Sequence, residues 1–305
     1  MLAALLIGVA ALAHAAWNLV VKARGASGPH VLTVALVVSV VGFAPVGLPS
    51  LLASAPASPA WPALALGSAL LHVAYFLLVQ RGYRLADVGV VYPLARGTGP
   101  LLSVLGAVLV LGERPPPVVL AGAALVISGV IVIGTATARP PVSSDGAFRP
   151  GRNGRGGSVS SDGARRRVGV AYGLAVGVLI AAYTVWDAAA VTTLAVEPVG
   201  YFWASLVGQL LVLSALSARR PRLVLDAARR HGRAAVAIGV LSPLAYIAIL
   251  AAYDLVPVSV VAPARELSVV VVALAGWLVF REPHPGRRLV GSGVVLAGVA
   301  LLALG

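Results

Sequence analysis

The chain has 305 residues, of which 59% are hydrophobic and only 11% charged, and its formal net charge is +13. Soluble domains carry about a quarter charged residues, so this composition excludes a soluble enzyme and predicts a membrane protein. The positive charge does not indicate nucleic acid binding, because the basic residues lie between long apolar segments, where they orient a chain in a bilayer. The chain has no cysteine, which excludes disulfides and thiolate metal sites.

Ten apolar segments follow one another, and each has about the length that a helix needs to cross the hydrocarbon core. They are too long for barrel strands, which cover about ten residues and alternate in polarity. The predicted fold class is therefore an all-α polytopic membrane protein with ten transmembrane helices. The expected spans are residues 2–21, 31–52, 61–81, 87–111, 117–136, 168–190, 199–217, 233–253, 258–280 and 287–304.

The first span ends in "HAAWNLVV" (14–21), and we expect it to remain in the protein as a helix. A signal peptide begins with basic residues, and residues 1–13 contain none. His14, Trp17 and Asn18 are therefore candidates for a functional site inside the membrane.

Residues 137–167 separate the spans into two groups of five. This stretch consists mainly of Pro, Gly, Ser and Arg, a composition that predicts a disordered linker. The expected organisation is a first five-helix repeat over 1–136 and a second over 168–305.

The two groups of spans resemble each other. The segment "YRLADVGVVYPLARG" (83–97) aligns with "YDLVPVSVVAPAREL" (253–267), and "HAAWNLVV" (14–21) aligns with "YTVWDAAA" (183–190). Because five is an odd number, two tandem copies cross the membrane in opposite directions. The sequence therefore predicts two inverted repeats, an architecture of many secondary transporters.

The distribution of basic residues predicts the orientation. Nearly all Lys and Arg lie in or beside the first, third, fifth, seventh and ninth connections between spans. The exceptions are Arg96, Arg114 and Arg265. Since cytoplasmic connections carry the excess of Lys and Arg, we expect these five connections, including the linker, in the cytoplasm and both termini outside.

These features together resemble the EamA branch of the drug/metabolite transporter superfamily. The resemblance rests on "HAAWNLVVKARG" (14–25), on the two five-helix repeats, and on acidic residues after the fourth and ninth spans, Glu113 and Glu282. It implies a ten-helix transporter that moves small metabolites, such as amino acids and related organic ions, usually outward. Ten-helix members are generally described with cytoplasmic termini, so the resemblance and the charge pattern imply opposite orientations.

Charged residues inside two corresponding spans predict a central site. Ionisable groups are costly within a membrane, so each needs a reason. Arg96 follows Pro93 in the fourth span, and Arg265 and Glu266 follow Pro263 in the ninth. Paired helix interruptions in the two halves are typical of a transport site, so we expect these three charged residues to line a cavity, with Arg96 and Glu266 close together. The alternative is an ion pair that only closes the bundle.

Asp187 in the sixth span is, with Glu266, a candidate for proton coupling, because intramembrane carboxylates commonly relay protons. The alternative is that Asp187 pairs with an arginine and never titrates. The remaining substrate-binding candidates are polar or aromatic, and each has a packing role as its alternative: His14, Trp17, Asn18, His72, Tyr92 and Trp186. We expect Glu113 and Glu282 to cap the next helix or to pair with neighbouring arginines.

The function predicted is secondary transport of small polar or charged organic metabolites, amino-acid-like, amine or related, outward by alternating access. Two alternatives are an intramembrane enzyme, using Asp187, His14 or His72 for acid–base chemistry, and a membrane receptor or assembly factor without flux. No metal or cofactor is expected, since the sequence shows no metal-ligand spacing and no phosphate-binding loop. The expected partners are a small-molecule substrate and the lipid bilayer, not nucleic acid, with the chain a monomer or homodimer.

The expected location is the inner membrane of a bacterium, as a multi-pass protein. The chain uses arginine almost to the exclusion of lysine, with Lys22 alone, and this usage favours a GC-rich bacterial genome.

Overall fold

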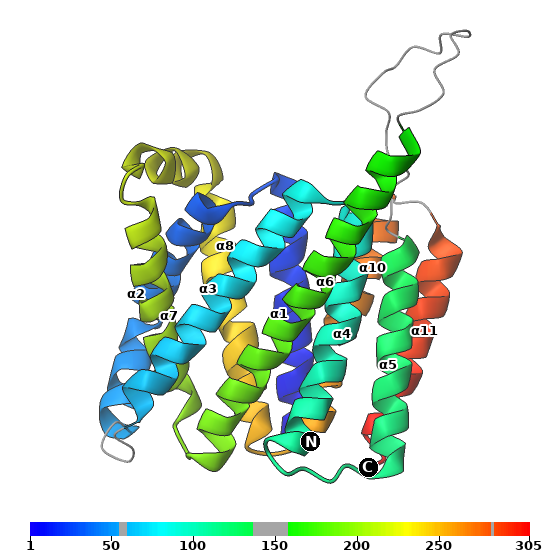
Figure 1. Cartoon of the computed structure of the whole chain (residues 1–305). Coiled ribbons are helices and arrows are strands. Elements are labelled where there is room, and N and C mark those ends of the chain that lie inside the picture. The colour runs from blue at the N-terminus through cyan, green and yellow to red at the C-terminus, as the bar shows by residue number, and fades with distance from the viewer. Residues whose placement is uncertain (55–59, 137–157, 282–283) are drawn as a thin grey trace, which may run out of the picture.

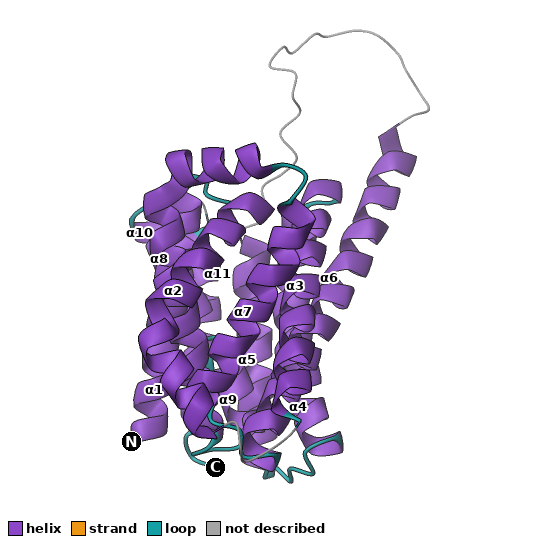
Figure 2. Ribbon diagram, turned by 90° about the vertical axis from the view of Figure 1, so that its left-hand side faces the viewer, coloured by secondary structure: helices purple, strands orange, loops and turns teal. Residues whose placement is uncertain are grey.

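The structure is a computed structural model that describes residues 1–54, 60–136, 158–281 and 284–305. These residues form helices without any strand, and ten helical spans are long and apolar enough to cross a membrane. Figures 1 and 2 show the helices side by side in one bundle. The predicted fold class is confirmed.

The helix bounds follow the expected spans closely in the first half. There the helices are α1 (Leu2–Arg24), α2 (Pro29–Ser54), α3 (Trp61–Leu85), α4 (Val88–Leu109) and α5 (Pro117–Ala136). The second half contains α6 (Ser158–Ala188) with a π-helical turn (Ala189–Thr193), α7 (Pro198–Ser217), α8 (Pro221–Tyr253), α9 (Val258–Ala264), α10 (Leu267–Leu278) and α11 (Pro285–Leu302).

Local chemistry explains several helix ends. Gly25 closes α1 with a left-handed backbone (φ 58°), and its N–H donates to the carbonyl of Val21, a conformation that glycine adopts without steric cost. Asp87 begins α4 by accepting the N–H of Gly89 at 2.8 Å. Proline stands at the start of α7, α8 and α11, where its missing N–H has no helical partner to lose.

Two helices begin earlier than the sequence predicts. Helix α6 begins at Ser158, so residues 158–167 are helical and not part of a disordered linker. The Pro, Gly and Ser content of 137–167 as a whole hid this end, which contains no proline and three of the helix-favouring arginines. The rest of the predicted linker lies outside the described residues.

Helix α8 begins at Pro221 and includes a segment that we predicted as a connection. Its first turns lie across the end of the bundle in Figure 1, and a kink at His231 (φ −122°, ψ 15°) joins them to the spanning part. Ala227 in this segment packs, as Trp17 and Val20 do, against an apolar cluster that contains Ala26 and Ala234. The segment was mistaken for a loop because its arginines obscured the short apolar face.

The two five-helix halves pack as a symmetric pair. Helix α2 packs on α7 and α5 on α11, and these pairs join corresponding helices of the two halves. Contacts between helices that do not correspond also come in equivalent sets of two. The contact of α1 with α8 matches that of α6 with α3, and the contact of α2 with α8 matches that of α7 with α3. One pair breaks the equality: α4 packs along α6 more extensively than α1 packs on α10. The halves are therefore inverted repeats in unequal conformations.

The two ends of the bundle differ in charge. Both termini lie at one end, which we call the terminal end (Figure 1). The α1–α2 and α3–α4 connections and the crosswise start of α8 lie at the other, which we call the basic end. This end carries Lys22, Arg24, Arg84, Arg219, Arg220, Arg222, Arg229 and Arg230.

Two carboxylates hold the halves together at the terminal end. Glu113, in the α4–α5 connection, accepts the backbone N–H groups of Val258 (2.7 Å) and Ser259 (3.0 Å) at the start of α9. Glu113 therefore caps a helix of the opposite half. We had expected it to cap the next helix, α5, or to pair with a neighbouring arginine. Glu197 caps α7 and accepts the hydroxyl of Ser50 from α2. Glu282 lies outside the described residues.

Glycines bring the backbones of α5 and α11 into direct contact. A Cβ added to Gly298 would lie 2.7 Å from the carbonyl oxygen of Gly122, and one added to Gly129 would lie 2.7 Å from that of Gly291. Backbone atoms cannot yield as a side chain can. Close approach of helices at small residues is a main source of packing energy in membranes, so these four glycines form a seam between the halves.

We predict that Gly298→Ala destabilises the protein and that Gly293→Ala on the same helix does not. Overpacking of this kind costs about 1–3 kcal/mol, whereas a Cβ at Gly293 meets nothing within 4 Å and alanine favours a helix. The thermal unfolding midpoint in detergent measures the difference. Equal midpoints for the two variants would contradict the seam.

Candidate functional site

A cavity of about 340 Å³ lies inside the bundle. Its walls come from both halves, with α1, α2, α3 and α4 facing α6, α7 and α8. It reaches the surface at Ser27 and Gly28 in the α1–α2 connection, which belongs to the basic end. Of the described residues, none from the α4–α5 or α8–α9 connections lines it. The cavity therefore extends to the basic end, and the described residues of these two connections at the terminal end lie outside its wall.

The ninth span is broken where its charged residues lie. Helix α9 ends at Ala264, α10 begins at Leu267, and Arg265 and Glu266 form the turn between them. The interruption is a local tightening, because both residues keep right-handed helical φ and ψ and the N–H of Arg265 still donates to the carbonyl of Val261 at 3.0 Å. The turn is tightened by the N–H of Glu266, which donates to the carbonyl of Pro263 at 3.0 Å. Helix α4 remains continuous through Pro93.

Arg96 and Glu266 meet across the two halves, as the repeat predicts. Arg96 Nη1 lies 3.3 Å from Glu266 Oε2, and the Glu266 side chain is 1% exposed. Arg265 Nε lies 3.7 Å from the other oxygen of the same carboxylate. One buried carboxylate is thus shared by two guanidinium groups. An unpaired charge at this depth would be costly, so the pairing allows both arginines to remain charged.

The two arginines face the cavity, whereas Glu266 lies behind them. Arg96 and Arg265 are lining residues and Glu266 is not. Arg265 also donates to the hydroxyl of Thr184 at 3.2 Å. Two guanidinium groups share one carboxylate, so the surface that they present to the cavity is positive. Guanidinium groups bind carboxylates and phosphates with paired hydrogen bonds.

His14, Asn18 and Tyr92 surround Arg96. Arg96 Nη2 lies 2.9 Å from His14 Nε2, and because a guanidinium only donates, the histidine nitrogen accepts and its ring is neutral. Asn18 Nδ2 donates to the carbonyl of His14 at 2.7 Å. The Tyr92 ring centroid is 5.7 Å from Arg96 Cζ, within the range of cation–π attraction. All of these residues line the cavity.

Asp187 lies just outside the cavity wall, completely buried. Its oxygens accept the hydroxyls of Tyr201 (2.7 Å) and Tyr246 (2.6 Å). His72 Nε2 lies 4.0 Å from Asp187 Oδ2. Helix α6 passes into its π-helical turn directly after this residue, and such turns occur frequently at functional sites. The alternative, that Asp187 pairs with an arginine, is not seen among the described residues.

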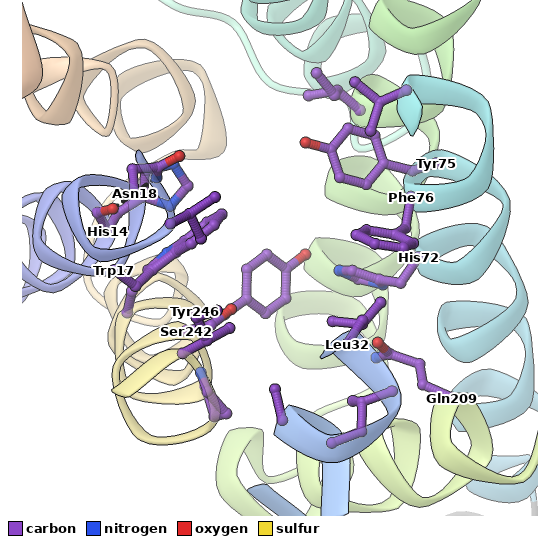
Figure 3. Close-up of a pocket in the computed structure, with 18 of the residues that line it drawn as sticks. His14, Trp17, Asn18, Leu32, His72, Tyr75, Phe76, Gln209, Ser242 and Tyr246 are labelled. Atoms are coloured by element: carbon purple, nitrogen blue, oxygen red, sulfur yellow. Dashed lines mark hydrogen bonds between the residues drawn. The ribbon is translucent and has the colours of Figure 1, made fainter. Parts of the chain in front are cut away.

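Aromatic rings form much of the remaining wall (Figure 3). On α3, His72, Tyr75 and Phe76 face His14 and Trp17 of α1 across the cavity. The rings in contact there are those of His72, Tyr75, Tyr183, Phe202 and Tyr246. Aromatic faces complement both flat organic groups and cations.

The matched tryptophans lie in different places. Trp17 lines the cavity, and its buried indole N–H has no hydrogen-bond partner in the structure. Trp186, in contrast, is not among the residues that line the cavity. It is 40% exposed, and its indole N–H donates to the carbonyl of Leu64 at 2.9 Å. The reason is Gly67 of α3, which leaves space for the indole ring against the outer side of that helix.

Sequence reasoning missed several polar residues around the cavity. Gln209 and Ser242 line it, and Tyr201 holds Asp187. The amide of Gln209 within an apolar span was the available signal, because polar groups in membrane helices face a cavity or a partner. Tyr201 gave no signal, since tyrosine near a span end is ordinarily an interface anchor. The described residues contain no group of three or more His, Cys, Asp or Glu that could hold a metal ion.

Comparison with known proteins agrees with this architecture. A solved structure, described as a crystal structure of a protein, is similar over 99% of this chain and 96% of its own, with a TM-score of 0.72 and 19% sequence identity. No curated protein sequence matches the chain. The profile of the EamA-like transporter family matches residues 1–135 and 167–304, which are the two five-helix halves. The chain is therefore a multi-pass membrane protein of the EamA-like transporter family, within the drug/metabolite transporter superfamily.

Proposed function

We propose that the protein is a secondary transporter that moves small polar or charged organic metabolites outward by alternating access. The observation that carries the proposal is the position of Arg265 and Glu266 at a break in the ninth span, on the wall of a cavity that extends to the basic end. Helix breaks at membrane depth are tolerated where they line a cavity, and they mark the substrate sites of many transporters.

The cavity favours a substrate that carries a carboxylate or another anionic group. Arg96 and Arg265 face the open space while Glu266 is hidden behind them, so a simple amine would meet positive charge. The aromatic wall opposite, with Tyr75 and Phe76, favours an apolar or flat body on the same molecule. An anion or a zwitterion of amino acid size fits this arrangement better than a sugar or a bare cation.

The unequal ends of the bundle support alternating access. The positive-inside rule would place the basic end in the cytoplasm, so the cavity would take up substrate there. At the terminal end, Glu113 joins the α4–α5 connection to α9 and would have to release α9 before the cavity could open outward. The inverted repeat provides a second conformation, in which the two halves exchange their packing.

We predict that Glu266→Gln abolishes transport, because both arginines lose their shared counter-charge. The measurement is flux of a panel of radiolabelled amino acids, amines, sugars and nucleosides from proteoliposomes. Arg265→Lys retains the charge but loses the forked donor geometry, and we expect weaker substrate binding with a folded protein.

Arg81→Gln is the matched control for these variants, because Arg81 is exposed and donates to the hydroxyl of Tyr172 outside the cavity. Its flux should equal that of the unaltered protein. Undiminished flux in Glu266→Gln would leave Glu266 with a packing role. If the unaltered protein moves no member of the panel and none changes its thermal stability, the transporter proposal is wrong.

A single cysteine will report which end of the cavity is open. The natural chain has none, so Ser242→Cys on the cavity wall is the only reactive thiol. We expect a membrane-impermeant maleimide to label it from the basic end. Glu113→Gln should increase labelling from the terminal end, because one acceptor for the α9 N–H groups is lost. Ser292→Cys, which is 4% exposed and away from the cavity, is the unreactive control. Labelling of Ser242→Cys from the terminal end alone would reverse the assignment.

Fusion of a reporter after Gly305 tests the orientation of the whole protein. The charge distribution predicts that a phosphatase, active only outside the cytoplasm, is active there and that a fluorescent reporter, which folds in the cytoplasm, is dark. The opposite pair of signals would place the termini and the terminal end in the cytoplasm.

A further inference from the structure

His72 occupies a distinct position where the cavity meets the buried Asp187. Its ring stacks on Tyr183, with centroids 4.4 Å apart, and lies edge-on to Tyr246 at 5.0 Å. The side chain is 14% exposed and lines the cavity, whereas Asp187 behind it has no exposed surface. Figure 3 shows the ring on the α3 wall, close to Tyr246. Water in the cavity can therefore reach part of the His72 ring, whereas Nε2 and Asp187 are buried behind it.

The hydrogen bonds of the ring determine which nitrogen carries the proton. His72 Nδ1 lies 2.9 Å from the carbonyl oxygen of Ser68. A carbonyl oxygen only accepts, so Nδ1 carries the hydrogen in the neutral ring and Nε2 holds a lone pair. Nε2 has no hydrogen-bond partner in the structure and is 4.0 Å from Asp187 Oδ2. A buried lone pair thus faces a carboxylate oxygen, and neither can donate to the other.

Addition of one proton to Nε2 would resolve this conflict. The proton comes from cavity water, a new N–H bond forms at Nε2, and the ring gains one positive charge. The resulting N–H points toward Asp187, so an unsatisfied acceptor becomes a charged donor beside a carboxylate. A buried nitrogen without a hydrogen-bond partner, as Nε2 is in the neutral ring, is unusual in proteins and requires an explanation.

Tyrosine hydroxyls occupy the other contacts of the Asp187 carboxylate. Two hydroxyls, from Tyr201 and Tyr246, donate to its oxygens. Among the described residues, His72 is the one basic side chain within 4.0 Å of it. The groups that face His72 are Asp187 and Tyr183 from α6, Phe202 from α7, Tyr246 from α8, and, at longer range, Arg265 from the α9–α10 break.

We propose that His72 Nε2 is the proton-binding site of this protein, with Asp187 as its buried counter-ion. This assigns the proton to the histidine and not to Asp187 itself, which the sequence had suggested. The role in transport rests on the proposed function: the proton on His72 binds together with an anionic substrate. Arg265 explains why the proton and the anion should bind together and not exclude each other. Its positive charge opposes a second positive charge on His72 until a substrate anion neutralises it.

The proton site can be tested without any substrate. The chain has five histidines, so ¹⁵N-histidine NMR of the full-length protein in nanodiscs resolves each ring, with His72→Gln to assign the signal. We expect the neutral Nδ1–H form at high pH and uptake of a proton at Nε2 between about pH 5 and 8. Asp187→Asn should lower the pH of that uptake by about 1–3 units, as for loss of an opposite charge at this distance.

His14 is the internal control, because its Nε2 already accepts from Arg96 and its signal should not respond to Asp187→Asn. Should Asp187→Asn prove unstable, Tyr246→Phe serves as the second variant, because it removes one hydrogen-bond donor to the Asp187 carboxylate. With one donor fewer, the carboxylate should attract a proton on His72 more strongly, so His72 should take up its proton at a higher pH. A His72 ring that stays neutral to pH 4, or that titrates identically in both variants, overturns the proton site.

Flux tests the coupling separately. Flux of an anionic panel member should rise as the pH falls through the protonation of His72. His72→Gln keeps an N–H donor for the Ser68 carbonyl but cannot take up a proton, so its flux should not vary with pH over that range. If the pH profile of His72→Gln matches that of the unaltered protein, coupling through His72 is wrong although transport stands. Absence of flux in the unaltered protein removes the proposed function and the coupling, and the NMR result still decides the proton site.

Discussion

The cost of an unpaired charge inside a membrane governs the centre of this protein. Arg96, Arg265 and Glu266 can lie at this depth only because they meet one another. Their meeting requires the two halves to face each other and requires the ninth span to break where Arg265 and Glu266 stand. The cavity, its positive surface and the hidden position of the carboxylate all follow from that requirement.

The inverted repeat supplies the geometry, and the differences between the halves supply the chemistry. Asn18 and Asp187 occupy matched positions, yet Asn18 bonds to its own helix while Asp187 binds two tyrosines. Trp17 lines the cavity while its counterpart Trp186 packs outside it. Of the matched positions of Asn18 and Asp187, only the one in the second half carries a carboxylate.

Sequence patterns were sufficient for the helices and for the central ion pair, because both arise from strong and local constraints. A run of about twenty apolar residues has one structural solution in a bilayer, and the offset between the repeats placed Arg96 opposite Glu266. The early starts of α6 and α8 were missed because arginine, together with serine in α6, is frequent in those segments and hides their helical character. The position of Trp186 could not be predicted because a helix has several faces, and which face meets the cavity is decided by packing partners such as Gly67. Tyr201 belongs to the candidate site only through its contact with Asp187, which no single-sequence pattern reveals.

The glycine seam has a consequence for the order in which the chain can be assembled. Helix α5 packs its Gly122 and Gly129 against α11, which follows it in the chain only after the other helices of the second half. Until α11 is made, these two glycines lack the backbone on which they pack. Closure of the bundle is a late step that depends on the C-terminal helix, so truncation within α11 removes the contact that holds the halves together at that face.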